Sequence, residues 1–214
     1  MPRRKSASQS SAGGPKLTGR FIRALGYAAR LHAHQTRKGK DHPYIGHLLG
    51  VASLVIEHGG DEDQAIAALL HDAVEDQGGL PRLAEIHRKF GAGVARIVDG
   101  CTDAYSDPKP EWLLRKQAYI ERIRREPAEI QLVSAADKLH NAREVLADLR
   151  REGDSVWERF KGKKEGTLWY YRQMVNALSQ SGRTPLVDEL DRVVSKLERL
   201  AAPPRSSNSA GQIP

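Results

Sequence analysis

Cysteine is almost absent from this sequence, because the 214 residues include only Cys101. A single thiol excludes an intramolecular disulfide framework and a CxxC zinc site, and it fits a reducing compartment. No stretch approaches the roughly 20 apolar residues of a transmembrane helix, and the basic N-terminus lacks the apolar segment of a signal peptide. We therefore expect a cytoplasmic protein without a membrane partner.

Aromatic residues are also scarce, at 6% of the chain against 39% for hydrophobic residues as a whole. The core must therefore consist mainly of Leu, Ile, Val and Ala, and the length fits one domain. Alternating β patterns are lacking, whereas apolar residues recur with a helical period from about residue 18 onward. The sequence predicts an all-α fold, a compact bundle of about eight to ten helices.

Capping residues and glycine pairs set the expected helix boundaries. Thr18 and Asp61 are plausible N-caps, and Gly59-Gly60 and Gly78-Gly79 are expected to end helices. The domain is expected to span residues 17–201, between a disordered basic tail at 1–16 and a disordered tail at 202–214. The expected helices cover residues 18–31, 47–58, 61–77, 80–90, 91–98, 112–124, 129–149, 167–179 and 185–200.

The net charge of +7 is concentrated in the two predicted tails. They hold five of the 34 basic residues and no acidic one, which leaves 29 basic against 27 acidic residues in the folded body. A nearly neutral body is not expected to bind nucleic acid. Only the N-terminal tail, with Arg3, Arg4, Lys5 and Lys16, is a candidate for such binding.

The adjacent pair His71-Asp72 follows a wholly apolar run, and Glu75 and Asp76 come one helical turn later. Residues three and four apart share a helix face, so one imidazole and three carboxylates are expected to lie together. Such a patch suits a divalent metal beside a water-activating acid. The same residues taken alone fit equally well the end of a helix with solvated acids and a hydrogen-bonded histidine.

Two further residues fit a metal site that draws its ligands from separate helices. His47 opens the second expected helix, and Asp137 follows a small, apolar run inside a long helix, where a lone charge would be destabilising. Together with His71 and Asp72 they offer two imidazole nitrogens and two carboxylates. This mixed donor set suits Mn²⁺, Fe²⁺ or Zn²⁺ better than Ca²⁺.

These residues belong to a series of short motifs that occur in a fixed order over residues 20–150. The series is Arg37-Lys38, Pro43-Tyr44-Ile45-x-His47, Leu70-His71-Asp72-x-x-Glu75-Asp76, Phe90-Gly91, Val98-Asp99-Gly100-x-Thr102, Arg115-Lys116 and Asp137-Lys138-Leu139-His140-Asn141. It resembles the HD-domain superfamily of metal-dependent phosphohydrolases. More narrowly, it resembles the hydrolase domain of RelA/SpoT-type enzymes, which remove the 3′-diphosphate from the alarmones ppGpp and pppGpp. The short chain is most similar to stand-alone small alarmone hydrolases.

The resemblance implies a role for each matching residue. The metal ligands would be His47, His71, Asp72 and Asp137, with Mn²⁺ the usual ion of the family. The residues that position and deprotonate the attacking water would be Glu75 and Asp76. The nucleobase contacts would be Arg37 and Lys38, and the ribose-side contact would be Asn141.

A basic and aromatic segment at residues 159–172 follows the motifs. It is either a wall for the 5′-phosphates of a substrate or a solvated lysine loop followed by a helix with packed aromatic residues. Under the first interpretation Tyr171 and Arg172 are the better candidates for substrate contacts, and Lys116 of the Arg115-Lys116 motif is a further one.

Two departures from the family pattern leave the identity of the substrate undecided. His47 is followed by Leu48 where the family usually has proline, and the spacer Gly39-Lys40-Asp41-His42 is one residue longer than is typical. Because the spacer borders the base pocket, adenosine alarmones such as ppApp are possible substrates beside guanosine alarmones. The alternatives are hydrolysis of nucleoside monophosphates or NADPH, and a catalytically silent alarmone-binding or antitoxin-like protein. The sequence does not indicate an oligomeric state.

Overall fold

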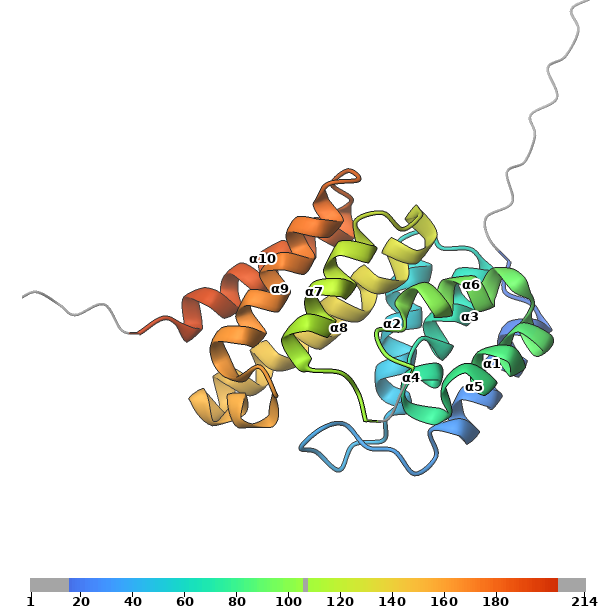
Figure 1. Cartoon of the computed structure of the whole chain (residues 1–214), viewed down its shortest axis with the longest axis horizontal. Helices are drawn as coiled ribbons and strands as arrows, with labels where there is room; N and C mark the ends of the chain where they lie inside the picture. Colours follow the sequence, from blue (N-terminus) through green and yellow to red (C-terminus); the bar gives the residue numbers. More distant parts are fainter. Residues whose placement is uncertain (1–15, 106–107, 204–214) are drawn as a thin grey trace, which may run out of the picture.

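The computed structural model describes residues 16–105 and 108–203. Within those ranges the chain forms ten α-helices and one 3-10 helix without a β-strand (Figure 1). Extended pairing there is limited to an isolated bridge between Thr36 and Pro43. The predicted all-α fold of about eight to ten helices is confirmed.

Most helices follow one another along the chain with short connections, and longer segments join α1 to α2 and α6 to α7. In chain order they are α1 (Gly19–Leu31), α2 (Ile45–Glu57), α3 (Glu62–Leu70), α4 (Ala73–Gln77), α5 (Gly79–Phe90), α6 (Ala92–Cys101), α7 (Trp112–Ile123), α8 (Ala128–Glu152), the 3-10 helix η1 (Gly153–Arg159), α9 (Lys163–Ser179) and α10 (Pro185–Ala201).

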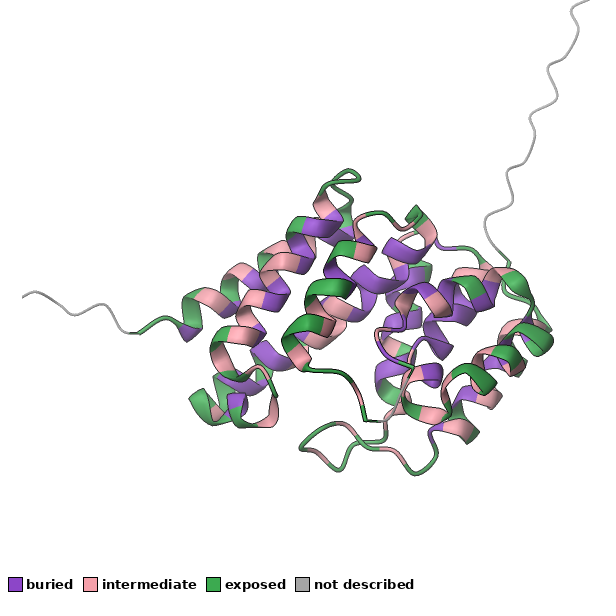
Figure 2. Ribbon diagram, viewed as in Figure 1, coloured by how far each residue is buried: buried purple, intermediate pink, exposed green. Residues whose placement is uncertain are grey.

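Helix α8 is the central element of the bundle. It packs against α2, α3 and α6 on one side and against α9, α10 and η1 on the other (Figure 1). Its buried apolar residues recur at helical spacing, as at Val133, Ala136, Leu139 and Leu146. Figure 2 shows buried residues concentrated along α8 and the faces of the helices that surround it. Asp137 lies inside this apolar run and is itself buried.

Both predicted N-caps are confirmed. The Thr18 side chain accepts a hydrogen bond from the Arg20 backbone N–H at 3.1 Å. Asp61 forms a capping box with Gln64, in which each side chain accepts from the backbone N–H of the other residue. These bonds satisfy N–H groups that the first turn of a helix leaves without partners.

The segment predicted as one helix over residues 61–77 is divided, and that prediction was wrong in this respect. Helix α3 ends at Leu70 and α4 begins at Ala73, so His71 and Asp72 lie at the junction. The backbone remains nearly helical there, and the Asp76 N–H still donates to the Asp72 carbonyl at 3.0 Å. The junction thus keeps Asp76 one turn beyond Asp72, as the sequence pattern required.

The 3-10 helix η1 was not predicted. The long helix α8 ends at Glu152, and the next residue, Gly153, has a φ of +63° and begins η1. A left-handed backbone conformation is easily adopted only by glycine, so the chain changes direction here. The 3-10 turn then brings Arg159 and the following residues toward the α1–α2 loop.

The loop between α1 and α2 folds back on itself. The Arg37 backbone N–H donates to the His42 carbonyl at 2.9 Å. At the tip Gly39 has a φ of +72°, and a Cβ there would meet Arg159 Cδ at 2.8 Å. The long spacer of the sequence pattern therefore packs directly on the end of η1, where a side chain at position 39 has no room.

No helix in the described ranges is long and apolar enough to cross a bilayer. All of the helices lie within the predicted domain at 17–201. The predicted tails at 1–16 and 202–214 lie outside the described residues, except for Lys16, Ala202 and Pro203.

Leu190 tests the packing of α10 against α8. Its side chain is fully buried on the apolar face of α10. We expect Leu190→Ala to lower the free energy of unfolding by about 2–5 kcal/mol, because buried methyl groups are lost and a cavity remains. Urea denaturation followed by circular dichroism measures the change. The control Leu200→Ala removes a side chain that is 49% exposed on the same helix and should change stability by less than about 0.5 kcal/mol. Equal effects of the two substitutions would contradict this packing.

Candidate active site

The four predicted metal ligands meet inside the bundle from three separate elements. His47 comes from the first turn of α2, His71 and Asp72 from the α3–α4 junction, and Asp137 from α8. The His71 Nε2 atom lies 3.0 Å from Asp72 Oδ2 and 3.6 Å from Asp137 Oδ1. The His47 Nε2 atom lies 3.3 Å from Asp137 Oδ1 and 3.6 Å from Asp72 Oδ2. Two imidazole nitrogens and two carboxylates thus face one point.

The other nitrogen of each histidine ring is already engaged. His71 Nδ1 lies 2.8 Å from the Ala68 carbonyl oxygen, which only accepts, so Nδ1 carries a proton and Nε2 is the nitrogen left to bind a metal. His47 Nδ1 lies 3.0 Å from His140 Nδ1. Both Nε2 atoms are buried and make no hydrogen bond. The ligand atoms of His47, His71 and Asp137 lie within 4.8 Å of one another. This cluster fits a divalent metal ion.

Hydrogen bonds from neighbouring side chains orient the two carboxylates. The Tyr44 hydroxyl donates to Asp72 Oδ2 at 2.6 Å. The Asn141 side-chain amide donates to Asp137 Oδ1 at 2.5 Å, and the Lys138 ammonium pairs with Asp137 Oδ2. Such outer partners fix the direction of a ligand before a metal arrives.

Electrostatics keep the carboxylates of the cluster ionised. Burial favours neutral carboxyl groups, but the His71 imidazole beside Asp72 and the Lys138 ammonium beside Asp137 hold both pKa values well below the usual range. Burial likewise opposes a charged His71, yet the charges of Asp72 and Asp137 raise its pKa well above the ordinary value. The cluster therefore attracts a cation, and a divalent ion bound there would replace the proton on His71.

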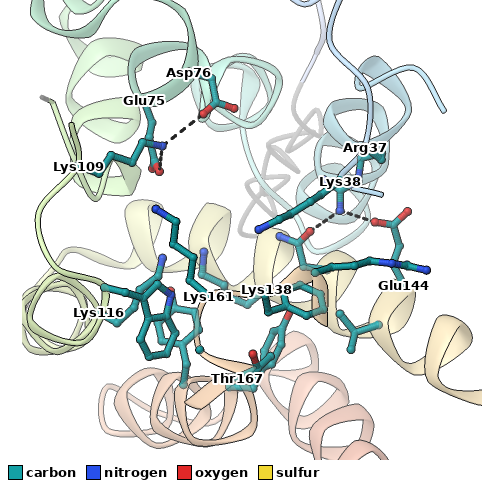
Figure 3. A pocket seen from close by; sticks show the side chains of 18 of the residues that line it. Arg37, Lys38, Glu75, Asp76, Lys109, Lys116, Lys138, Glu144, Lys161 and Thr167 are labelled. Atoms are coloured by element: carbon teal, nitrogen blue, oxygen red, sulfur yellow. Dashed lines mark hydrogen bonds and ion pairs between the residues drawn. The ribbon is translucent and has the colours of Figure 1, made fainter. Parts of the chain in front are cut away.

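A cavity of about 840 Å³ opens beside this cluster (Figure 3). Its walls come from the α1–α2 loop, α4, the segment before α7, α7 itself, α8, the end of η1, the turn after it and α9. The basic side chains that line it are Arg37, Lys38, Lys40, Lys109, Arg115, Lys116, Lys138, Arg159 and Lys161. The acidic ones are Glu75, Asp76, Glu144 and Asp148. This excess of positive charge suits a ligand with several anionic groups.

Glu75 and Asp76 project from α4 into the cavity (Figure 3). The Lys109 ammonium lies 2.7 Å from Glu75 Oε1 and 3.6 Å from Asp76 Oδ1. Burial, followed by the charge of Asp103, raises the pKa of Glu75, and burial, followed by the charge of Asp72, raises the pKa of Asp76. A carboxylate with a raised pKa is a better acceptor for a proton from water.

Five of the six predicted substrate contacts line the cavity, namely Arg37, Lys38, Lys116, Asn141 and Tyr171. Arg37 donates to Asn141 Oδ1 at 2.6 Å, and its guanidinium lies 5.3 Å from the centre of the Tyr44 ring. Lys38 has no carboxylate partner in the described part of the chain, and burial, followed by the charge of Lys161, lowers its pKa.

Arg172 is the exception among the predicted substrate contacts. Its guanidinium donates to Asp191 and Glu198 of α10 at 2.7 and 2.6 Å, and also to Ser195. It is not among the described residues that line the cavity. Successive helical residues point about 100° apart, so α9 turns Tyr171 toward the cavity and Arg172 toward α10. Arg172 holds two helices together, and we do not assign it to the site.

The charged cavity residues to which the sequence analysis assigned no role include Lys109, Lys138 and Glu144. Lys138 follows Asp137 directly within its motif, and Glu144 stands seven residues after Asp137 on the same helix face, so both carried a positional signal. Lys109 carried none, because it lies in a loop 34 residues from its partner Glu75.

Comparisons with known proteins agree with this geometry. A family model described as HD domain matches residues 24–168. The chain is 40% identical over 140 residues to the guanosine-3′,5′-bis(diphosphate) 3′-pyrophosphohydrolase MESH1 of Xenopus tropicalis, which covers 64% of this chain and 73% of that protein. It is 39% identical over 128 residues to the human protein of the same name, which covers 58% of this chain and 69% of that protein.

The fold is also similar to that of solved structures. A metazoan ortholog of SpoT, described as hydrolysing ppGpp and acting in starvation responses, superposes with a TM-score of 0.71 and 27% identity. The match covers 88% of this chain and 100% of that one.

Asp72 and Glu75 provide a test that separates a ligand from a neighbouring acid. Asp72→Ala is expected to weaken Mn²⁺ binding more than about tenfold, because it removes a charged donor from the cluster. Glu75→Gln should leave the affinity within about threefold, because Glu75 lies in the cavity and outside the cluster. Isothermal titration calorimetry with Mn²⁺ measures both. Equal losses in the two variants would assign Glu75 to the metal as well.

Proposed function

Since the chain belongs to the HD domain family, we propose that it hydrolyses the 3′-diphosphate of (p)ppGpp-type alarmones. The products are pyrophosphate and a nucleoside 5′-phosphate with a free 3′-hydroxyl. The observation that carries this proposal is the position of Glu75 and Asp76, which lie in a strongly cationic cavity next to the histidine–aspartate cluster. The relatives named as pyrophosphohydrolases of this class support it.

The cofactor we propose is Mn²⁺, held by His47, His71, Asp72 and Asp137. The donor set of two imidazoles and two carboxylates supports this choice, although it also suits Fe²⁺ and Zn²⁺. When bound, such an ion polarises a phosphoryl oxygen and lowers the pKa of a coordinated water.

Glu75 and Asp76 handle the proton of the attacking water. The water oxygen forms a bond to the phosphorus attached to the 3′-oxygen, and the bond between that phosphorus and the 3′-oxygen breaks. A proton passes from the water to the carboxylate and is returned to the 3′-oxygen as it leaves. The raised pKa of Glu75 and the ion pair with Lys109 suit this exchange, since the carboxylate is basic and held in place.

The remaining walls of the cavity recognise the nucleotide. The Arg37 guanidinium contacts the base together with Lys38. A guanidinium is flat, so it stacks favourably on the face of a purine. In this proposal the ribose contacts Asn141 and the phosphates contact Lys116, Lys161 and Tyr171, all four of which line the cavity. Several anionic groups need several cations, and this requirement matches the nine basic side chains.

The charge of the cavity argues against the alternatives. Nine basic side chains against four acidic ones line the cavity, which suits a substrate with several phosphates better than a nucleoside monophosphate with one. A silent binding protein would not require both acids beside a complete ligand set. The product analysis below tests NADPH and the adenosine alarmone ppApp as substrates beside ppGpp. The cytoplasmic location stays a prediction.

Product analysis tests the proposed reaction. Protein loaded with Mn²⁺ is incubated with ppGpp, ppApp, GMP and NADPH, and chromatography is expected to show pyrophosphate and GDP from ppGpp. Glu75→Gln should lower kcat by about 10²–10⁴-fold because the proton acceptor is lost. Arg172→Gln, outside the cavity, should stay within twofold of the unmodified protein. Intact ppGpp after incubation with the Mn²⁺-bound protein would refute the function.

Lys109 tests the acid–base role through pH. Its positive charge lowers the pKa of Glu75, so Lys109→Ala should raise that pKa further. The basic form of Glu75 is then lost at higher pH, and the acid limb of the kcat/KM profile should move to higher pH. Lys89→Ala, which removes an exposed lysine paired with Glu85, should leave the limb in place. A slower variant with an unmoved limb would show that Lys109 does not act on Glu75.

A further inference from the structure

The Arg37 guanidinium is fixed by three groups before any ligand binds. Its Nη2 atom donates to Asn141 Oδ1 at 2.6 Å and to Glu144 Oε2, and its Cζ atom lies 5.3 Å from the centre of the Tyr44 ring. Both hydrogen bonds use the same nitrogen. In the described part of the chain Nε and Nη1 have no hydrogen-bond partner, so this edge of the guanidinium stays available.

The partners of Arg37 stand on one face of α8. Positions 137, 141 and 144 are four and three residues apart, so their side chains follow one another along the helix. Asn141 accepts from Arg37 and donates to Asp137 Oδ1, which fixes its amide at both ends. A continuous chain of contacts therefore runs from Glu144 through Arg37 and Asn141 to the Asp137 carboxylate.

Glu144 is the acid of the cavity that has no role in the proposed reaction and whose ion-pair partner is Arg37. Glu75 and Asp76 handle protons, and Asp148 pairs with Lys40 and Arg159 at 2.8 and 3.0 Å. A fourth carboxylate repels a polyanionic substrate and so weakens its binding. A favourable effect of Glu144 elsewhere in the site is needed to offset this repulsion. Figure 3 shows Glu144 across the cavity from Glu75 and Asp76, with its carboxylate directed at Arg37.

We propose that Glu144 is a positioning residue for nucleobase recognition, holding the Arg37 guanidinium in the orientation in which it contacts a purine. The inference rests on the proposed function, because it assumes a purine nucleotide in this cavity. An arginine side chain has many rotamers, and their loss on binding weakens affinity. Fixing Arg37 beforehand by a charged hydrogen bond removes that loss, and the gain exceeds the repulsion between one carboxylate and the phosphates.

A comparison of two substrates tests this role. One is ppGpp, and the other is the base-free ribose 3,5-bis(diphosphate), which carries the same phosphates. Glu144→Ala is expected to raise KM for ppGpp about tenfold with kcat changed less than twofold, because a charged hydrogen bond is lost. For the base-free compound kcat/KM should stay equal or rise slightly. Glu144→Gln, which keeps the shape and loses the charge, should lie between the unmodified protein and Glu144→Ala.

Two controls separate positioning from general structural damage. Glu189→Gln breaks the ion pair of the adjacent Arg143 on the surface and should change neither substrate. In an Arg37→Ala background, Glu144→Ala should have no further effect on ppGpp, because the side chain that it positions is gone. An equal loss of kcat/KM for both substrates, or unchanged KM for ppGpp, would overturn the inference.

Equilibrium binding tests the role of Glu144 independently of the proposed reaction. Calorimetry with ppGpp in a Glu75→Gln background, where turnover is slow, should show about tenfold weaker binding when Glu144→Ala is added. If the unmodified protein bound ppGpp in this Glu144-dependent way but did not hydrolyse it, the reaction would be refuted and the positioning role supported. Hydrolysis of ppGpp with affinity indifferent to Glu144 would refute the positioning role alone.

Discussion

The structure depends on the burial of two carboxylates and two imidazoles at the centre of a helical bundle. Ionised groups inside a protein are strongly destabilising unless each has a partner of opposite charge or a metal. Asp72 and Asp137 remain ionised because His71, Lys138, Tyr44 and Asn141 surround them. This requirement constrains how α2, the α3–α4 junction and α8 pack against one another, and the cavity opens beside the point where these elements meet.

Helix α8 connects the histidine–aspartate cluster to the part of the cavity that Arg37 lines. Its apolar face anchors it between two groups of helices, so the residues on its other face have fixed positions. Asp137, Asn141 and Glu144 lie along that face, and the last two hold Arg37 from the α1–α2 loop. The position of Arg37, a loop residue, is thereby fixed relative to a rigid helix. Recognition of a flat base requires such a fixed position.

The sequence predicted most helices and pointed to candidate ligands because their signals are local. Apolar spacing marked the α-helices, except that α3 and α4 were expected as one, and Thr18 and Asp61 marked two starts. The errors arose where several conformations fit the same local pattern. The break between α3 and α4 at His71 leaves the helical register intact, so the spacing of apolar residues does not reveal it. Arg172 follows Tyr171 in a basic and aromatic segment, and only the rotation of α9 decides that it turns to α10.

By itself the sequence determined the all-α class, the candidate ligands His47, His71, Asp72 and Asp137, and the acid pair beside them. Burial periodicity and unexplained charges in apolar runs are properties of neighbouring residues, so they can be read along the chain. Only the tertiary structure decided which cations face the cavity and which carboxylates they meet. Lys109 pairs with Glu75 across 34 residues and Arg37 with Glu144 across 107. Contacts this distant follow from helix packing, which no local pattern encodes.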